Sequence, residues 1–338
     1  MKHKNVLVTG AGGFVGRAVC DILVRRGYAV SAAARDVLNL PDTVRPRKIG
    51  DIGPDTDWVD AVFATDAVIH LAARVHVMNE TAKDALAQNR RINTEGTRAL
   101  AEAAAAAGVR RFVFVSTVKV LGETTGIRPF MDMDPPRPPD PYAQSKWEAE
   151  RALWAIAEKT GMEVVILRPP LVYGPGVKGN VRTLLDRLAR GGALPLPLAG
   201  IHNRRSMLYV GNLADAIALC LEHPRAAGQT YLIRDGEDLS TPDLIRRIDA
   251  AVKRPSNLMA LPPVLLRLAA MAVGRGAAAE RLTGSLAVDD SRIRDDLDWH
   301  PPFTVTQGLE ETVLWHRDLL AGTRSSIPAH IRPSERKR

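Results

Sequence analysis

The stretch Val6-Leu7-Val8-Thr9-Gly10-Ala11-Gly12-Gly13-Phe14-Val15-Gly16 decides the fold. A strand-like run is followed by glycines and then by a helical pattern that extends to Gly27. Such glycines let the chain turn tightly, bring backbone N–H groups close to a pyrophosphate and let the helix pack against the sheet, and the positive end of the helix dipole favours the anion. The spacing Gly-x-x-Gly-x-x-Gly differs from the commoner Gly-x-Gly-x-x-Gly, but its place between a strand and a helix favours dinucleotide binding over a structural turn. The residues predicted to hold the dinucleotide here are Gly10, Gly13, Phe14, Val15 and Gly16.

The chain that follows alternates between short apolar runs and longer helical patterns. Strands are predicted at 28–33, 67–71, 111–116 and 164–167, and helices at 94–107 and 141–160, ended by Gly108 and Gly161. Continuous apolar runs are typical of parallel strands that are buried on both faces. Repeated strand–helix units connect by right-handed crossovers. The sequence therefore predicts an α/β fold with a Rossmann-type, doubly wound parallel sheet.

A second, smaller lobe is predicted beyond Arg168, where prolines and glycines interrupt the alternation. Strand and helix signals return between 207 and 233, so part of this region is expected to rejoin the sheet. We therefore divide the chain into a dinucleotide-binding domain at 1–170, rejoined by about 207–235, and a discontinuous C-terminal substrate lobe at 171–206 and 236–320. A basic, flexible tail is expected at 322–338.

The end of the second strand bears on the choice of cofactor. A carboxylate at this place normally binds the adenosine ribose of NAD, but the chain has Ala32-Ala33-Ala34-Arg35-Asp36. Arg35 suits a 2′-phosphate and favours NADP, whereas Asp36 contacts the ribose if the strand ends later, so NAD or NADP stays open. Asp51, next to Ile52, is a candidate to accept a hydrogen bond from the adenine amino group, and a surface turn explains it almost as well.

The reacting groups are predicted in Asp140-Pro141-Tyr142-Ala143-Gln144-Ser145-Lys146, which begins with a helix cap and a proline suited to the first turn. Tyr142 and Lys146 share one helix face. A nearby ammonium and bound oxidised nicotinamide favour the phenolate, so Tyr142 is the candidate base. Thr117, at the carboxyl end of a buried strand, is placed to contact the substrate. Ser116 is the alternative, and either hydroxyl could instead cap its own backbone.

Together these motifs resemble the extended short-chain dehydrogenases/reductases, specifically the NAD-dependent epimerase/dehydratase family and its UDP-glucose 4-epimerase-like bacterial subgroup. The resemblance covers roughly 320 residues, nearly everything before the tail. It rests on Thr9 to Gly16, which we call the phosphate loop, and on His70-Leu71-Ala72-Ala73, Asn93, Ser116-Thr117, Tyr142 to Lys146, Arg168-Pro169-Pro170-Leu171-Val172-Tyr173-Gly174-Pro175-Gly176 and Asp289 to Trp299.

The resemblance implies roles for individual residues. Tyr142 is the base, Lys146 also holds the nicotinamide ribose, and Thr117 orients the substrate. The further positions implied to bind or support the cofactor are Leu71, Ala72, Ala73, Asn93, Pro169 and Pro170. Those implied to hold the nucleotide diphosphate of the substrate are Asn180, Arg205 and Arg281, and an arginine suits a diphosphate on chemical grounds as well.

Departures from the family pattern narrow the activity. Val118 and Lys119 replace the acid pair with which dehydratases eliminate water, so a 4,6-dehydratase is not expected. Leu121 and Leu171 replace a usual tyrosine and an asparagine that faces the sugar. Gly284-Ser285-Leu286 lacks the bulky tyrosine that restricts some sites to unsubstituted hexoses, which leaves room for an N-acetylated sugar.

The leading hypothesis is epimerisation at C4 of a UDP-hexose or UDP-N-acetylhexosamine through a 4-keto intermediate. The alternative is an NADPH-dependent reductase of a UDP-4-keto-6-deoxy-N-acetylhexosamine, which Arg35 favours. A non-catalytic NADP-binding sensor is a remote third, because such sensors tend to lose the tyrosine. The resemblance also implies a homodimer built through 94–107 and 142–160.

Composition limits the other classes of function. The chain has 338 residues, with 46% hydrophobic and 25% charged, and no apolar run of the roughly 20 residues that span a bilayer. Met1 to Asn5 leads straight into the first strand, so no signal peptide is expected, and the distant Cys20 and Cys220 suggest a reducing cytoplasm and no metal. Of the net charge of +8, the tail contributes +4, and the rest is taken as spread out. We therefore expect no nucleic-acid partner and at most peripheral membrane contact through the tail.

Overall fold

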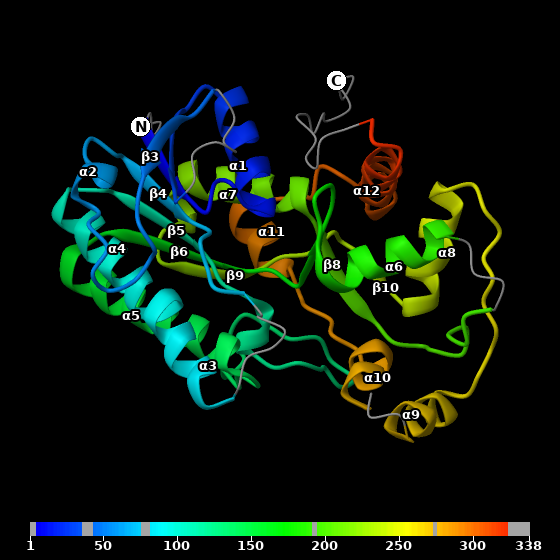
Figure 1. The fold of residues 1–338 in the computed structure, drawn as a ribbon. Helices are drawn as coiled ribbons and strands as arrows, with labels where there is room; N and C mark the ends of the chain where they lie inside the picture. Colours follow the sequence, from blue (N-terminus) through cyan, green and yellow to red (C-terminus); the bar gives the residue numbers. More distant parts are fainter. Residues whose placement is uncertain (1–4, 36–42, 76–81, 191–194, 273–275, 324–338) are drawn as a thin grey trace.

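In the part of the chain that the structure describes, a sheet of seven parallel strands forms the larger lobe (Figure 1). The computed structural model describes residues 5–35, 43–75, 82–190, 195–272 and 276–323. In spatial order the strands are β3 (Arg45–Lys48), β2 (Ala29–Ala34), β1 (Asn5–Thr9), β4 (Ala67–His70), β5 (Arg111–Val115), β6 (Glu163–Arg168) and β9 (Gln229–Leu232). Every neighbouring pair is parallel, which confirms the predicted doubly wound sheet. The strand order reverses between β1 and β4, where open α/β sheets form their ligand crevice.

Helices cover both faces of this sheet (Figure 1). One face packs against α1 (Phe14–Arg25) and α7 (Val210–Glu222), and the other against α2 (Val59–Val62), α4 (Gly96–Ala106) and α5 (Pro141–Thr160). Successive strand residues point to opposite faces, so Val6 and Val8 join the α1/α7 core and Leu7 joins the α4/α5 core. The strands are apolar throughout because both faces are buried.

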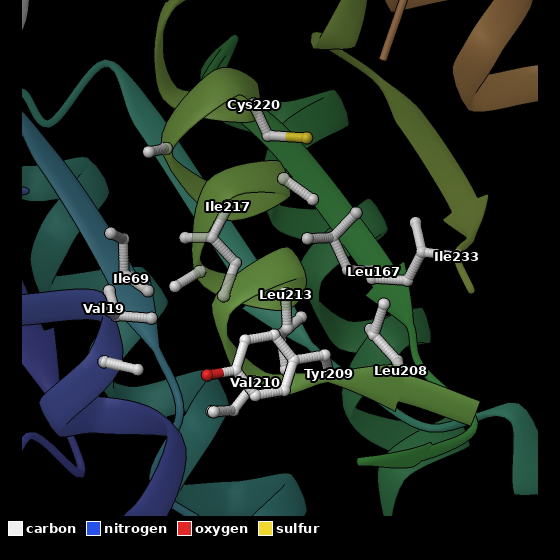
Figure 2. Packing of buried hydrophobic residues seen from close by; sticks show 14 of the residues in the cluster. Val19, Ile69, Leu167, Leu208, Tyr209, Val210, Leu213, Ile217, Cys220 and Ile233 are labelled. Carbon is white, nitrogen blue, oxygen red and sulfur yellow. The ribbon is translucent and has the colours of Figure 1, made fainter. Parts of the chain in front are cut away.

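The α1/α7 core shows how closely this side is filled (Figure 2). Val19 of α1 and Ile69 of β4 lie beside Leu213 and Ile217 of α7, with Leu167 of β6 on the same face. Both cysteines, Cys20 and Cys220, are buried and unpaired. Fully burying one of the Val, Leu or Ile side chains of this core contributes about 1.5–3 kcal/mol.

The smaller lobe is built on a second sheet in which β8 (Arg205–Tyr209) lies between β7 (Leu171–Tyr173) and β10 (Asp238–Leu239). The helices around it are α6 (Gly179–Arg190), α8 (Thr241–Ala251), α9 (Pro263–Ala272), α10 (Gly276–Thr283) and α12 (Val305–Leu320), while α11 (Ser291–Leu297) contacts β9. The region 207–235 returns to the large sheet through α7 and β9, whereas β8 belongs to the smaller sheet. The lobe boundaries themselves stay a prediction.

None of the helices in the described residues is both long and apolar enough to cross a bilayer. Residues 324–338, which make up most of the predicted basic tail, lie outside the described residues.

Candidate active site

The phosphate loop joins β1 to α1 through close backbone contacts. Gly10 has a φ of +68°, and a Cβ there would lie 2.8 Å from the Ala72 nitrogen. A Cβ at Gly16 would lie 2.1 Å from the Gly10 carbonyl oxygen, so only glycine lets α1 pack this close to the loop. Gly13 is the N-cap of α1 and offers no side-chain cap to the first turn, which contains no acidic residue. These features fit a dinucleotide pyrophosphate at the helix N-terminus.

A buried hydrogen-bond chain holds the loop after β4 against the phosphate loop. The amides of Leu71 and Ala72 both donate to Thr9 Oγ1, at 3.2 Å each. Thr9 Oγ1 lies 2.6 Å from His70 Nδ1, and His70 Nε2 lies 2.9 Å from Thr97 Oγ1. Since Thr9 already accepts two N–H groups, its proton goes to Nδ1, and His70 donates from Nε2. The structure thus places Leu71 and Ala72, followed by Ala73, beside the phosphate loop.

His70 stays neutral in this chain. Burial, together with the positive charge of Lys146, lowers the pKa of His70 to about 3. The sequence motif contains His70 but does not reveal this role, because the partners Thr9 and Thr97 come from distant segments.

Asn93 lies in a short π-helical segment, Arg90–Glu95, that precedes α4. Its Oδ1 accepts from the Arg74 amide at 2.7 Å, and its Nδ2 donates to Ser145 Oγ at 3.0 Å and to the Arg74 carbonyl at 3.1 Å. The buried Asn93 therefore ties the loop after β4 to the helix that carries the reacting groups. Its polar atoms already have protein partners, so Asn93 supports the loop after β4.

Helix α5 carries Tyr142 and Lys146 one turn apart on the same face. Asp140 caps its first turn by accepting from the Ala143 amide at 2.7 Å, and Gly161 ends it with a φ of +74°. Tyr142 is half-buried, and burial, reinforced by the negative charge of Asp140, raises its pKa to about 12. Burial thus opposes the phenolate that the predicted base chemistry requires.

Lys146 is 2% exposed and lies over an aromatic ring. Its Nζ is 3.8 Å from the centroid of the Phe114 ring, which provides a cation–π contact. Burial lowers the pKa of Lys146 to about 7, and the charge of Glu150 opposes this shift. Burial therefore disfavours the ammonium form of Lys146, which the Phe114 ring and the Glu150 charge favour.

Two hydroxyls follow β5, and the structure separates their roles. Ser116 is buried and donates its proton to the carboxylate of Glu150, so only its oxygen is left to accept from a substrate. Thr117 accepts from the Lys119 amide at 3.2 Å, as in the backbone-capping interpretation, and its own O–H is still able to donate. Thr117 is thus the better candidate for the substrate.

Lys119 links the Thr117 segment to α5. Its Nζ lies 2.6 Å from Asp140 Oδ2, in a partly buried ion pair with the residue that caps α5. The sequence shows only that Lys119 replaces an acidic residue of dehydratases. Its partner, 21 positions away, depends on the fold.

Arg168 and Glu150 form a buried ion pair next to Ser116. Arg168 donates to Glu150 from Nη2 at 2.6 Å and from Nε at 3.1 Å, and Glu150 also accepts from Ser116. The next residues, Pro169 and Pro170, are buried, and the Pro169 carbonyl accepts from the Val118 amide at 3.0 Å. Sequence reasoning missed Glu150, although its position one turn beyond Lys146 was a usable signal.

Arg35 follows β2 directly, as the sequence predicts, but it has a protein partner. Its Nη1 lies 3.0 Å from Asp51 Oδ1, and both side chains are exposed. The alternative ribose ligand, Asp36, lies outside the described residues. Ile52 packs against α4, since a Cβ at Gly96 would lie 2.6 Å from its side chain.

A cavity of about 580 Å³ opens beside Asp51. Arg47, Asp51 and Arg91 are among its lining residues, but Thr117, Tyr142 and Lys146 are not. It therefore belongs to the region predicted for the adenosine end and does not mark the reaction centre.

The three residues predicted to bind the diphosphate of the substrate lie on three different elements. Asn180 is exposed at the start of α6, and Arg205, at the start of β8, donates to the Gly284 carbonyl at 3.1 Å. Burial lowers the pKa of Arg205, and Glu123 opposes the shift. Arg281 belongs to α10, but its side chain lies outside what the structure describes. Within the described residues, no group of three or more His, Cys, Asp or Glu residues could hold a metal ion.

Comparison with known proteins adds to this geometry. The model of the NAD dependent epimerase/dehydratase family matches residues 6–233. A Vibrio cholerae protein named UDP-glucose 4-epimerase is 40% identical over 312 residues, which cover 91% of this chain and 94% of the relative. The Thermotoga maritima UDP-glucose 4-epimerase structure with UDP-glucose has a TM-score of 0.76 at 25% identity, covering 94% and 99%. An Agrobacterium tumefaciens short-chain dehydrogenase/reductase superfamily structure with bound NAD has a TM-score of 0.74 at 26% identity, covering 94% and 98%.

Proposed function

Because the chain belongs to the NAD dependent epimerase/dehydratase family, we propose that it is an enzyme that inverts C4 of a UDP-hexose or UDP-N-acetylhexosamine through a 4-keto intermediate. One observation carries this: Thr117, Tyr142 and Lys146 lie on segments tied to each other, at the sheet edge that also bears the phosphate loop. The relative named UDP-glucose 4-epimerase, 40% identical over almost the whole chain, supports the same reaction.

Each reacting residue has a distinct task in this proposal. Tyr142 takes the proton from the C4 hydroxyl of the sugar and later returns it. Thr117 donates its free O–H to a sugar oxygen and so orients C4. Lys146 holds the nicotinamide ribose. Bound NAD supplies the hydride acceptor, and its positive nicotinamide favours the phenolate that burial opposes.

The surroundings of Thr117 argue against elimination of water. Val118 and Lys119 have no carboxylate to offer to the sugar. In addition, Val118 is buried and Lys119 is paired with Asp140. Elimination would need an acid–base pair here. Epimerisation needs only Tyr142 to exchange the proton.

The sugar is proposed to include N-acetylated hexoses. Gly284, Ser285 and Leu286 follow α10, and the Leu286 amide donates to the Arg204 carbonyl at 2.9 Å, next to Arg205. None of the residues Gly284, Ser285 and Leu286 is the bulky tyrosine that would restrict the site to unsubstituted hexoses, which supports an N-acetylated sugar.

The reaction is tested by a proton NMR time course of the purified protein with UDP-N-acetylglucosamine or UDP-glucose and a trace of NAD, far below stoichiometric. We expect the C4-epimer signal to appear with one of the two sugars. A second candidate, the NADPH-dependent 4-keto-sugar reductase, is favoured by Arg35 directly after β2. Failure of both sugars in protein that binds NADP would overturn the epimerase and favour the reductase.

We also propose a cytoplasmic homodimer built through α4 and α5. The two buried, unpaired cysteines suit a reducing compartment, and α4 and α5 pack against each other to form one surface. Light scattering should give the mass of two chains. The mass of one chain would contradict the dimer.

A further inference from the structure

Helix α9 presents large apolar side chains to the outside. Val264 is 64% exposed, Leu265 50%, Leu268 53% and Met271 57%. Residues at this spacing share one face of a helix. Leu266, about half a turn away, packs instead toward the core residues Leu198, Ile201 and Ile245. The helix is therefore apolar on the side that faces out as well as on the side that faces in.

The exposed face of α9 extends to the neighbouring helix. α10 packs against α9 and exposes Leu282, and both helices lie at the outer end of the smaller lobe (Figure 1). Scattered exposed apolar residues are normal in proteins, but a contiguous group marks a contact surface. We refer to Val264, Leu265, Leu268, Met271 and Leu282 as the α9 face.

The sequence segment that contains the α9 face is strongly basic. The segment 253–283 contains five basic residues and one acidic residue, Glu280, and so carries +4. The tail at 322–338 carries another +4, so these two segments account for the whole net charge of +8. The expectation that the charge outside the tail is spread along the chain is therefore wrong. Half of the net charge belongs to the segment 253–283, which contains the α9 face.

We propose that the α9 face docks the protein on an anionic phospholipid bilayer. Apolar side chains on one helix face enter the boundary between headgroups and acyl chains, and basic residues nearby are attracted to anionic headgroups. Either attraction alone is weak, and the two together give stable but reversible binding.

A second copy of the chain fits this face less well than a bilayer. A two-fold contact would bring the same +4 segment of both copies together, where like charges repel. Five side chains are also few for the roughly 20–30 residues that each partner contributes to a standard interface.

Docking through the α9 face would hold the substrate lobe at the membrane surface. α10 ends at Thr283, and the next residue, Gly284, accepts the hydrogen bond from Arg205. The bilayer contact would therefore be continuous along the chain with the segment beside Arg205. The docking proposal stands on the α9 face and its charge alone, independently of the proposed reaction.

The test is cosedimentation of the full chain with vesicles of phosphatidylcholine, with and without phosphatidylglycerol. We expect binding to the vesicles that contain phosphatidylglycerol and a decrease at high salt. The double variant Leu265→Ser with Leu268→Ser should bind at least ten-fold more weakly. The matched control, Val59→Ser with Phe63→Ser, replaces two residues that are 69% and 73% exposed at α2 and should bind as the original chain does.

A second control separates the α9 face from the tail. Changing Arg332, Arg336, Lys337 and Arg338 to Gln removes four positive charges there, and sensitivity of binding to the α9 substitutions should persist. Unchanged binding of the α9 variant, with an unaltered melting temperature, would overturn the proposal. So would binding that depends on the tail alone, or absence of vesicle binding with self-association that the α9 variant abolishes.

Discussion

Burial moves the pKa values of Tyr142 and Lys146 in opposite directions, to about 12 and to about 7. Both shifts disfavour the charged form, since each group loses hydration when it is enclosed. In the proposed reaction, the positive charge of a bound oxidised nicotinamide would favour the Tyr142 phenolate that burial disfavours.

Replacing Tyr142 by Phe should lower turnover by about 10²–10⁴-fold, because the proton acceptor for the sugar hydroxyl is lost. Binding of NAD, measured by fluorescence titration, should change little, since the ring is kept. Full turnover in this variant would rule out Tyr142 as the base.

Replacing Lys119 by Met should move the rising limb of the pH–rate profile to higher pH. The negative charge of Asp140 raises the pKa of Tyr142, and Lys119 is its ion-pair partner. Without Lys119 that charge acts unopposed, so Tyr142 loses its proton at a higher pH.

The controls for Lys119 are Lys119→Arg, which keeps the charge and should keep the profile, and Asp140→Asn, which should move the limb to lower pH. A Lys119→Met profile that coincides with that of the original protein would show that the ion pair does not act on Tyr142.

Replacing Arg35 by Asp should shift the ratio of NADP to NAD affinity toward NAD, because a carboxylate repels the 2′-phosphate and accepts from the ribose. Asp51→Asn should have the opposite effect by freeing Arg35 from its ion pair. Titration of both cofactors into each variant measures the ratio. An unmoved ratio in both would remove Arg35 from cofactor selection.

Among the individual site residues, the sequence predicts those that belong to contiguous motifs. Tyr142 and Lys146 lie within one helical turn, and Thr117 ends a recognisable strand. The partners of those residues could not be predicted, because Glu150 with Ser116, and Lys119 with Asp140, meet only through the tertiary fold. The choice between Ser116 and Thr117 as the substrate-orienting hydroxyl stays open from the sequence for the same reason.

The elements that carry the site are fixed by local signals at their ends and by tertiary contacts in between. Helix α5 begins and ends where its cap, its proline and Gly161 indicate. The helix predicted as one piece over 94–107 instead follows the π-helical segment Arg90–Glu95. The π-helical segment contains Asn93, which contacts Arg74 and Ser145. These contacts depend on the tertiary fold, so local helix preference does not predict the π-helical segment.

Replacing Asn93 by Ala should lower the free energy of unfolding by about 1–3 kcal/mol, because it removes the hydrogen bonds of a buried amide to the Arg74 backbone and to Ser145 Oγ. It should also weaken NAD binding through the loop after β4. Urea unfolding and NAD titration measure the two effects. Asn180→Ala, at an exposed position, should leave stability unchanged, and equal stabilities of the two variants would contradict the supporting role of Asn93.

Over the whole molecule, the parallel sheet follows from the sequence because buried strands are apolar throughout and alternate with helices. The existence of a smaller lobe also follows from the prolines and glycines that interrupt the strand–helix alternation after Arg168. Its construction does not, since β7, β8 and β10 are short and pair across long separations. The outward apolar face of α9 escaped sequence reasoning as well, because periodicity alone does not show which helix face is covered.

The central claim is that hydride leaves C4 of the sugar and returns to the same carbon on its other face. The most direct measurement uses UDP-N-acetylglucosamine or UDP-glucose carrying deuterium at C4, with a trace of NAD in ordinary water. The account predicts that the C4 epimer keeps its deuterium and that Tyr142→Phe forms almost none of it. An epimer that has exchanged deuterium for solvent hydrogen, or no epimer from either sugar, would contradict it.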